Sequence, residues 1–263
     1  MTDRSAPIGG GDRWPAGTAR LVLARCGSTN AEALARAATE PGPVWVMSHE
    51  QTAGRGRRGR DWAMPPGNFA ASLALRPSGS PGQAALLSFV AALALDDALR
   101  AACGPQARLA LKWPNDVLLN GGKVAGILLE SAGRAGGVDA LAVGIGVNLA
   151  AAPDPAALEP GAWAPVSVLG ETGLTVAPED FLDLLAPAFD HWQRQLRDYG
   201  FAPIRTAWLA RAAKLGEVIT ARTGRDTISG RFDGIDDDGA LILTLPGGAT
   251  RVIAAADVHF EGA

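Results

Sequence analysis

Residues 109–130 read LALKWPNDVLLNGGKVAGILLE, and this stretch shows how the middle of the chain is organised. Residues 109–112 have the apolar character of a strand, which the turn-forming residues 113–116 interrupt. Asn120-Gly121, a dipeptide that strongly favours a tight hairpin, separates two further strands at 117–119 and 123–130. The hairpin therefore predicts that Asp116 and Lys123 lie near the same end of a sheet.

Working outward from this hairpin, the chain alternates strands with helices. Two capping-box patterns, Thr29 with Glu32 and Ser80 with Gln83, predict helices that run to about residues 39 and 100. Residues 51–68 are rich in glycine and proline, which predicts a loop. The other expected elements are strands at 21–23, 44–47, 72–75 and 141–149 and helices at 181–199 and 204–213.

The pattern changes near residue 214, where short strands with alternating hydrophobicity begin. The expected strands are 218–221, 228–232, 241–245 and 251–253, with Asp238-Gly239 and Gly247-Gly248 supplying turns. About fifty residues of this kind predict a small barrel or sandwich. We therefore expect three parts: a flexible N-terminal segment at 1–18, a large domain at 19–213 and a small β-domain at 214–263.

Composition narrows the class of protein. The chain has 263 residues, of which 48% are hydrophobic and 19% charged, so it can build a sizeable core and is not disordered. We expect no secretory signal peptide, because the first 18 residues lack an apolar run, and no membrane span. Two cysteines and three histidines are too few and too scattered for a disulfide framework or a zinc site. A cytoplasmic location without a resident metal is the expectation.

Positive charge is unevenly distributed in this net-acidic chain. The formal net charge is −3, yet four arginines fall within residues 55–60, and only three of the 24 basic residues are lysines. Residues 54–59 match the G-x-G-x-x-G pattern of dinucleotide-binding folds, but two prolines follow where that fold needs a helix. The loop could also be an RNA-binding arginine–glycine segment or an ordinary solvated loop. We favour a loop that grips an anion through guanidinium and backbone donors.

Several other polar groups admit both a structural and a functional interpretation. Lys112 to Asp116 could be an ordinary turn, although Lys123 nearby suggests a phosphate site. Gly144 and Gly146 could mark a bulge, close packing or a ligand surface. Trp62 could belong to the core or form a platform for a ring, and the polar residues Ser28 to Asn30 exceed what a helix cap needs.

Taken together, these segments resemble the successive motifs of biotin protein ligases, in order and with compatible spacing from about residue 20 to 260. The resemblance rests on Ser28-Thr29-Asn30, the run QTAGRGRRGR at 51–60 with Trp62, KWPND at 112–116, KVAGIL at 123–128 and GIGVN at 144–148. It implies an α+β fold: a mixed sheet with helices on one side, related to class II aminoacyl-tRNA synthetases, plus a small SH3-like C-terminal barrel. Only about twenty residues precede the first expected strand, so we expect no helix-turn-helix domain and no specific DNA binding.

The resemblance also implies an activity, ATP-dependent biotinylation of a lysine on a biotin carboxyl carrier protein through biotinyl-5′-AMP. Magnesium would accompany ATP, and the enzyme would be a monomer or a homodimer. Lys123, Asp116 and Arg57 are the implied catalytic residues. The implied biotin-binding residues are Ser28, Thr29, Asn30, Gln51, Gly54, Arg55, Lys123 and Gly126. The implied ATP- or adenylate-binding residues are Arg57, Arg58, Arg60, Trp62, Lys112, Asn115, Lys123 and Asn148.

Three questions stay open at this point. Asp116 could orient the acceptor amine or deprotonate it. A lipoate or octanoate ligase is the nearest rival, although the arginine loop and the 112–116 block argue against it. A non-catalytic adenylate or biotin sensor is the rival of a different class, and the presence of both Lys123 and Asp116 argues for catalysis. The C-terminal residues 254–258 lack the glycine that the resemblance implies in the last turn of the barrel, so the final strand departs from the pattern of the family.

Overall fold

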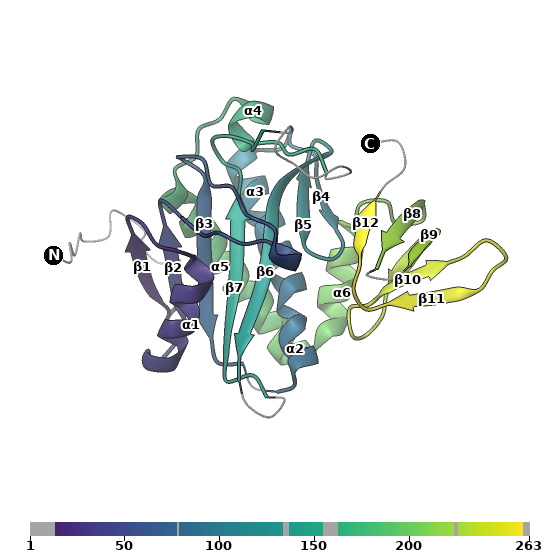
Figure 1. The fold of residues 1–263 in the computed structure, drawn as a ribbon, viewed down its shortest axis with the longest axis horizontal. Coiled ribbons are helices and arrows are strands. Elements are labelled where there is room, and N and C mark those ends of the chain that lie inside the picture. Colours follow the sequence, from purple (N-terminus) through teal and green to yellow (C-terminus); the bar gives the residue numbers. More distant parts are fainter. Residues whose placement is uncertain (1–13, 78, 134–136, 155–162, 224–225, 260–263) are drawn as a thin grey trace.

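The computed structural model describes residues 14–77, 79–133, 137–154, 163–223 and 226–259. Its larger sheet has seven strands in the order β1-β2-β3-β7-β6-β5-β4 (Figure 1). β1 and β2 are parallel and every other neighbouring pair is antiparallel, so the sheet is mixed, as the resemblance implies. The strands are β1 (Ala19–Leu23), β2 (Val44–Ser48), β3 (Phe69–Leu75), β4 (Leu109–Lys112), β5 (Asp116–Leu119), β6 (Gly122–Ala132) and β7 (Ala140–Val147).

The two faces of this sheet are covered differently. Helices α3 (Leu87–Cys103) and α5 (Pro178–Tyr199) pack on one face, where the main core contains Trp45, Phe69 and Phe189. Helix α1 (Thr29–Thr39) lies on the other face, and its small residues Ala33 and Ala37 pack against β2 and β7 (Figure 1). The expectation of helices on one side therefore holds for α3 and α5 but not for α1. The remaining open part of the α1 face forms the floor of the pocket described below.

Two predicted helix starts have different outcomes. Ser80 and Gln83 form the predicted capping box, with Pro81 opening α2 (Pro81–Ala85), and α3 ends at the C-cap residue Gly104. The helix is divided at Leu86 rather than continuous. The predicted Thr29–Glu32 box is wrong: Ser28 is the N-cap residue and makes no side-chain cap hydrogen bond. The Thr29 hydroxyl instead contacts Gln51 and Ser72, which belong to other elements.

Other boundaries differ modestly from the expectations. β3 begins at Phe69, three residues before the predicted start. All seven of its residues are buried, so the strand has no polar face whose alternation would mark its beginning in the sequence. The short helix α4 (Val168–Thr172) was not predicted, and α6 (Phe201–Leu209) ends before the expected residue 213. Asn120 and Gly121 both have positive φ angles, which is the geometry that the predicted tight hairpin requires.

The C-terminal part is an antiparallel sheet of five strands in the order β11-β10-β9-β8-β12, consistent with the SH3-like domain that the resemblance implies. It consists of β8 (Val218–Arg222), β9 (Thr227–Ile235), β10 (Leu241–Thr244), β11 (Thr250–Ile253) and β12 (Asp257–His259). Phe232 of β9 packs against Trp208 of α6, and the indole N–H of Trp113 donates to the carbonyl of Gly239 at 3.0 Å. These contacts hold the small sheet against the end of the larger one.

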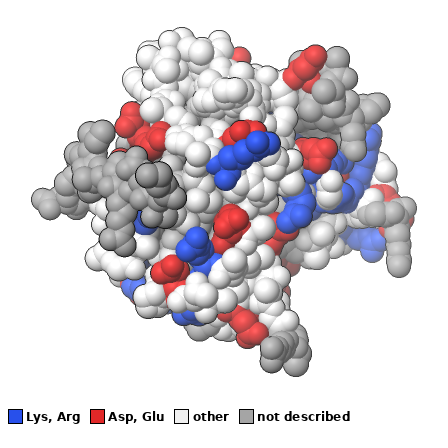
Figure 2. All heavy atoms as spheres, turned by 60° about the vertical axis from the view of Figure 1, so that its left-hand side comes forward, with Lys and Arg blue, Asp and Glu red and all other residues white. Residues whose placement is uncertain are grey.

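Among the described residues, no helix combines the length and the apolar character needed to cross a membrane. Figure 2 shows one face of the molecule, on which basic and acidic side chains are interspersed.

Candidate active site

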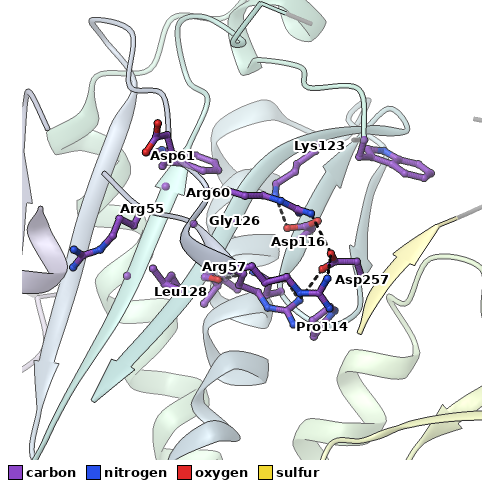
Figure 3. A pocket seen from close by; sticks show the side chains of 18 of the residues that line it. Arg55, Arg57, Arg60, Asp61, Pro114, Asp116, Lys123, Gly126, Leu128 and Asp257 are labelled. Carbon is purple, nitrogen blue, oxygen red and sulfur yellow. Dashed lines mark hydrogen bonds and ion pairs between the residues drawn. The ribbon is translucent and has the colours of Figure 1, made fainter. Parts of the chain in front are cut away.

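A cavity of about 1030 Å³ opens on the α1 face of the large sheet and extends to the C-terminal sheet. Its wall combines the start of α1, the loop at 51–63, the turn after β4, strands β6 and β7, and residues of β8, β9 and β12. Figure 3 shows that Arg55 lies at one end of this cavity, while Arg57, Arg60 and Asp257 gather with Asp116 and Lys123 at the other. The pocket therefore has two ends with different chemistry.

A buried carboxylate lies between two lysines at the second end. Lys123 Nζ is 2.7 Å from Asp116 Oδ1, and Lys112 Nζ is 3.4 Å from Oδ2. The three residues come together because β5 begins at Asp116, which pairs with Lys112 of β4, while Lys123 lies at the start of β6. Both Lys112 and Asp116 are at most 9% exposed. The expected approach of Asp116 and Lys123 is therefore confirmed.

Burial and charge act on these groups in opposite directions. Burial acts to raise the pKa of Asp116, but the charges of Lys123 and Lys112 outweigh it and bring that pKa below its ordinary value. Burial lowers the pKa of Lys112, and the attraction of Asp116 compensates only in part. One buried carboxylate thus faces two ammonium groups in the wall of the cavity, an arrangement that suits an anionic ligand.

The arginine loop leans on the C-terminal sheet. It contains a short 3-10 turn, η1 (Arg57–Gly59), in which Arg58 has a positive φ angle. The carboxylate of Asp257 accepts ion pairs from three arginines, from Arg58 at 3.0 Å, Arg60 at 3.3 Å and Arg57 at 3.7 Å. Burial lowers the pKa of Arg57, although Asp257 and Asp116 oppose the effect. Three guanidinium groups thus converge on the carboxylate of Asp257.

Polar side chains around α1 form the first end of the pocket. Gln51 Oε1 accepts a hydrogen bond from the backbone N–H of Thr29 at 2.8 Å, and Ser72 Oγ lies 2.6 Å from Asn30 Oδ1. The Asn30 amide also donates to the carboxylate of Glu130 at 2.7 Å. Ser28 lines the cavity at the N-terminal end of α1, where backbone N–H groups lack helical partners. Apart from the ion pair between Arg55 and Glu130, this end offers neutral donors and acceptors, which suit a polar uncharged group.

The alternate glycines of β7 make room for side chains that pack against this face of the sheet. A Cβ atom on Gly144 would lie 2.2 Å from Asn30 Oδ1, and one on Gly146 would lie 2.4 Å from the Trp62 ring. Gly126 of β6 faces the same ring, with a Cβ contact of 3.1 Å. Close packing therefore accounts for these glycines, which also line the cavity. Trp62 lies over the glycines with one face of its ring, and Lys123 Nζ is 5.7 Å from the ring centroid.

Fifteen of the sixteen predicted site residues line the cavity, and Gly54 does not. Gly54 is buried behind the wall, where a Cβ atom would lie 2.9 Å from the carbonyl oxygen of Trp62. Its contribution is to let the two arms of the loop approach. Asn115 and Asn148 line the cavity but also spend their amide groups internally, on the carbonyls of Ile127 and Val166. Asn115 additionally accepts from Arg57 at 3.3 Å.

The sequence analysis did not identify Asp61 and Asp257, which line the cavity, or Glu130, which lies just outside it. Asp257 lies about 200 positions from the arginines that it pairs with, and Glu130 lies at the far end of a strand whose first residues carried the motif. An excess of arginine in one loop predicts that some carboxylate balances it, but no spacing rule identifies which one. Only the tertiary structure brings these partners together.

The fold and the pocket define a protein ligase of the biotin and lipoate class. Residues 23–148 match the Biotin/lipoate A/B protein ligase family, and residues 214–260 match the Biotin protein ligase C terminal domain. The chain is 68% identical over 241 residues to the biotin–[acetyl-CoA-carboxylase] ligase of Paracoccus denitrificans, covering 92% of this chain and all of that one. The chain belongs to the biotin protein ligase family.

More distant relatives agree with this assignment. The biotin–[acetyl-CoA-carboxylase] ligase of Mycobacterium tuberculosis is 36% identical, with 97% of this chain and 92% of the relative covered. The structure of the Aquifex aeolicus biotin protein ligase, solved in complex with biotin and ATP, superposes with a TM-score of 0.77. At 23% identity, and with 91% of this chain and 97% of that chain covered, the superposition supports the fold.

Proposed function

We propose that this protein couples ATP to the attachment of biotin to one lysine of a biotin carboxyl carrier domain. The observation that carries the proposal is the Lys112–Asp116–Lys123 cluster, which shares one cavity with the arginine loop. Membership of the biotin protein ligase family and the carboxylase ligase named among its relatives support biotin as the substrate and a carboxylase domain as the acceptor.

In the first step, a carboxylate oxygen of biotin attacks the α-phosphorus of ATP. A P–O bond forms, the bond to the bridging oxygen breaks, and pyrophosphate leaves with the electron pair. The product, biotinyl-5′-AMP, is a mixed anhydride. Lys123 is proposed to stabilise the negative charge that develops around the α-phosphate. Its ion pair with Asp116 holds the ammonium group in position before the reaction begins.

In the second step, the acceptor amine attacks the acyl carbon. A C–N bond forms, the C–O bond to phosphate breaks, AMP leaves, and the amine loses a proton. The lowered pKa of Asp116, which burial opposes and the two lysines impose, makes its carboxylate a weak base. We therefore propose that Asp116 holds the incoming ammonium by charge and that solvent or phosphate takes the proton.

The two ends of the pocket fit the two halves of the adenylate. The neutral end, with Ser28, Thr29, Asn30 and Gln51, is proposed to bind the ureido ring of biotin. The cationic end, with Arg57, Arg58, Arg60 and Lys112, is proposed to bind the phosphates. Arg55 is proposed to close over biotin and the exposed face of Trp62 to stack on adenine. Asn115 is proposed to orient Arg57, and Asn148 to contact the nucleotide.

Magnesium is proposed to enter with ATP. Within the part of the chain that the structure describes, no group of three or more His, Cys, Asp or Glu side chains lies close enough to hold a metal ion. Phosphate oxygens and water are therefore the proposed ligands of the cation, which would neutralise phosphate charge.

Pyrophosphate release tests the first step. The protein is mixed with ATP, magnesium and either biotin or lipoate. We expect pyrophosphate release with biotin and none with lipoate. Release with lipoate but not biotin would make the protein a lipoate ligase. Transfer of labelled biotin to an isolated carrier domain tests the second step, and biotin binding without any pyrophosphate release would indicate a sensor. A cytoplasmic location, the absence of specific DNA binding and a monomeric or dimeric state stay predictions.

A further inference from the structure

Glu130 is an acidic residue just outside the wall of the pocket that no step above uses. It lies on β6, four residues beyond Gly126, and its side chain is 29% exposed. Its Oε2 atom accepts from the Asn30 amide at 2.7 Å, and its Oε1 atom lies 3.3 Å from Arg55 Nη2. Both partners line the cavity. Glu130 thus joins two pocket residues that come from different elements, the helix α1 and the arginine loop.

We propose that Glu130 is a positioning residue for the biotin pocket. It fixes the orientation of the Asn30 amide and, through it, the direction of the hydrogen bonds around Ser72 and Thr29. It also holds Arg55 at the biotin end of the loop, away from the arginines that contact Asp257. The inference rests on the proposed function, because it takes the neutral end of the pocket as the biotin site.

Two acceptors lie beside the NH₂ group of Asn30. A carboxylate and a backbone carbonyl can only accept, so the Asn30 NH₂ group must face Glu130 and the carbonyl of Leu128, which is 3.2 Å away. Asn30 Oδ1 must then face Ser72, whose hydroxyl hydrogen it accepts at 2.6 Å. A charged acceptor makes the stronger of the two bonds to the NH₂ group. Glu130 therefore determines which way the amide points.

The same donor-to-acceptor reasoning extends from Asn30 toward the pocket. Because Ser72 has spent its single hydrogen on Asn30, the Thr29 hydroxyl must donate to Ser72 Oγ at 2.8 Å or to Gln51 Oε1 at 3.1 Å. Gln51 Oε1 also accepts from the Thr29 backbone, so the Gln51 amide presents its NH₂ group away from α1. A ureido carbonyl needs such donors. Without Glu130, the Leu128 carbonyl at 3.2 Å is the remaining acceptor that orients the Asn30 NH₂ group, so the direction of this chain of hydrogen bonds is less firmly fixed.

The second contact of Glu130 separates Arg55 from the other arginines of its loop. Figure 3 shows Arg55 pointing away from the group formed by Arg57, Arg60 and Asp257. Like charges in a short loop repel one another, and a separate carboxylate partner offsets this repulsion for Arg55. The loop is thereby fixed at both ends, by Glu130 near biotin and by Asp257 near the phosphates.

The test compares Glu130→Ala with Glu130→Gln, measuring biotin affinity by calorimetric titration without ATP. Alanine removes both contacts, and biotin should bind about 10- to 100-fold more weakly, the range for losing a hydrogen bond to a charged group. Glutamine keeps an acceptor for Asn30 but not the charge for Arg55, so its affinity should be intermediate. The KM for ATP and the kcat at saturating biotin should stay within about threefold of the wild-type values.

Asp183→Ala is the matched control. Asp183 forms an ion pair with Arg20 at similar exposure, between α5 and β1 and outside the cavity. This variant should keep full biotin affinity, whatever its melting temperature. Wild-type affinity in both Glu130 variants would overturn the inference, as would equal losses of affinity that follow the loss of melting temperature. A wild-type protein that neither binds biotin nor releases pyrophosphate would instead overturn the proposed function on which the inference rests.

Discussion

At the scale of single residues, the site depends on a carboxylate held between two ammonium groups. Taking three charges out of water costs free energy that their mutual attraction offsets only in part. Lys112 shows the imbalance, because burial lowers its pKa more than Asp116 restores it. Such a cluster is poor at stabilising a fold compared with apolar residues of similar volume. Its presence in the cavity therefore favours a role in ligand binding and catalysis.

Lys123→Ala should leave the fold intact and slow adenylate formation by about 10²–10³-fold, the range for losing one preorganised charged or hydrogen-bonding group. The Lys123 side chain is 28% exposed, so its removal leaves no large cavity. Pyrophosphate release measures the rate, and thermal unfolding measures the stability. If melting temperature and activity fall together, Lys123 has a structural role and the assignment is wrong.

Asp116→Asn should slow transfer to the carrier lysine more than adenylate formation. Asparagine keeps the size of the side chain but removes the charge that faces Lys112 and Lys123. Both steps should therefore slow, and the transfer step should lose about tenfold more, because the acceptor brings another cation with a pKa near 10.4. Pyrophosphate release and labelled biotin on the carrier report the steps separately. Equal losses would place Asp116 in adenylate formation or in structure.

The same residue predicts how stability depends on pH. The pKa of Asp116 is lowered in the folded protein, so its ion pairs contribute stability that is fully present above the unfolded pKa of about 3.9. That contribution is lost only as the pH falls through the lower, folded pKa. The difference in unfolding free energy between wild type and Asp116→Asn should therefore be constant from pH 7 to about 5 and narrow below about 4. A difference that disappears between pH 7 and 5 would contradict the assignment.

At the scale of elements, glycines in β6 and β7 leave room for the Trp62 ring of the loop to pack against the sheet. Gly146→Ala should displace the Trp62 ring, because the new Cβ atom would lie 2.4 Å from it. We expect the KM for ATP to rise about tenfold, within the range for losing one base–aromatic stack, with biotin affinity little changed. Gly82→Ala is the control: its Cβ atom would meet Ser80 Oγ at 3.8 Å, and the residue lies on α2, outside the pocket. An unchanged KM for ATP would remove Trp62 as the adenine platform.

The elements also show what a sequence can predict. Ser80 with Gln83 forms a cap because both partners are local, and Asn120-Gly121 forms its hairpin for the same reason. Thr29 failed as a cap because Ser72 and Gln51, distant in sequence, compete for its polar atoms. The motif residues were predicted well because they are contiguous. Their orienting partners were not, because pairings across a hundred or more positions leave no periodic signal.

At the scale of the whole molecule, the C-terminal sheet is part of the site. Trp113, in the turn between Lys112 and Asp116, donates to Gly239, and Asp257 holds three arginines of the loop. The cavity itself includes residues of β8 and β9. The small sheet therefore contributes one wall of the cavity and anchors the loop, and a change in how it docks should alter catalysis.

Asp257→Asn tests this coupling. Its carboxylate lies within 3.0 to 3.7 Å of the three guanidinium groups, and asparagine keeps the shape but removes the negative charge that the three arginines share. The loop should then dock less firmly, so water should reach the anhydride and biotinyl-5′-AMP should escape. Overall transfer should fall about tenfold, roughly the 1.4 kcal/mol of one strong polar contact, while pyrophosphate release continues without acceptor. Free biotinyl-5′-AMP in solution, quantified by chromatography, measures the escape.

Asp233→Asn is the matched control, because Asp233 pairs with Arg231 on the same small sheet and lies outside the cavity. If the two variants retain the adenylate equally well, Asp257 does not anchor the loop, and the C-terminal sheet acts only as a wall.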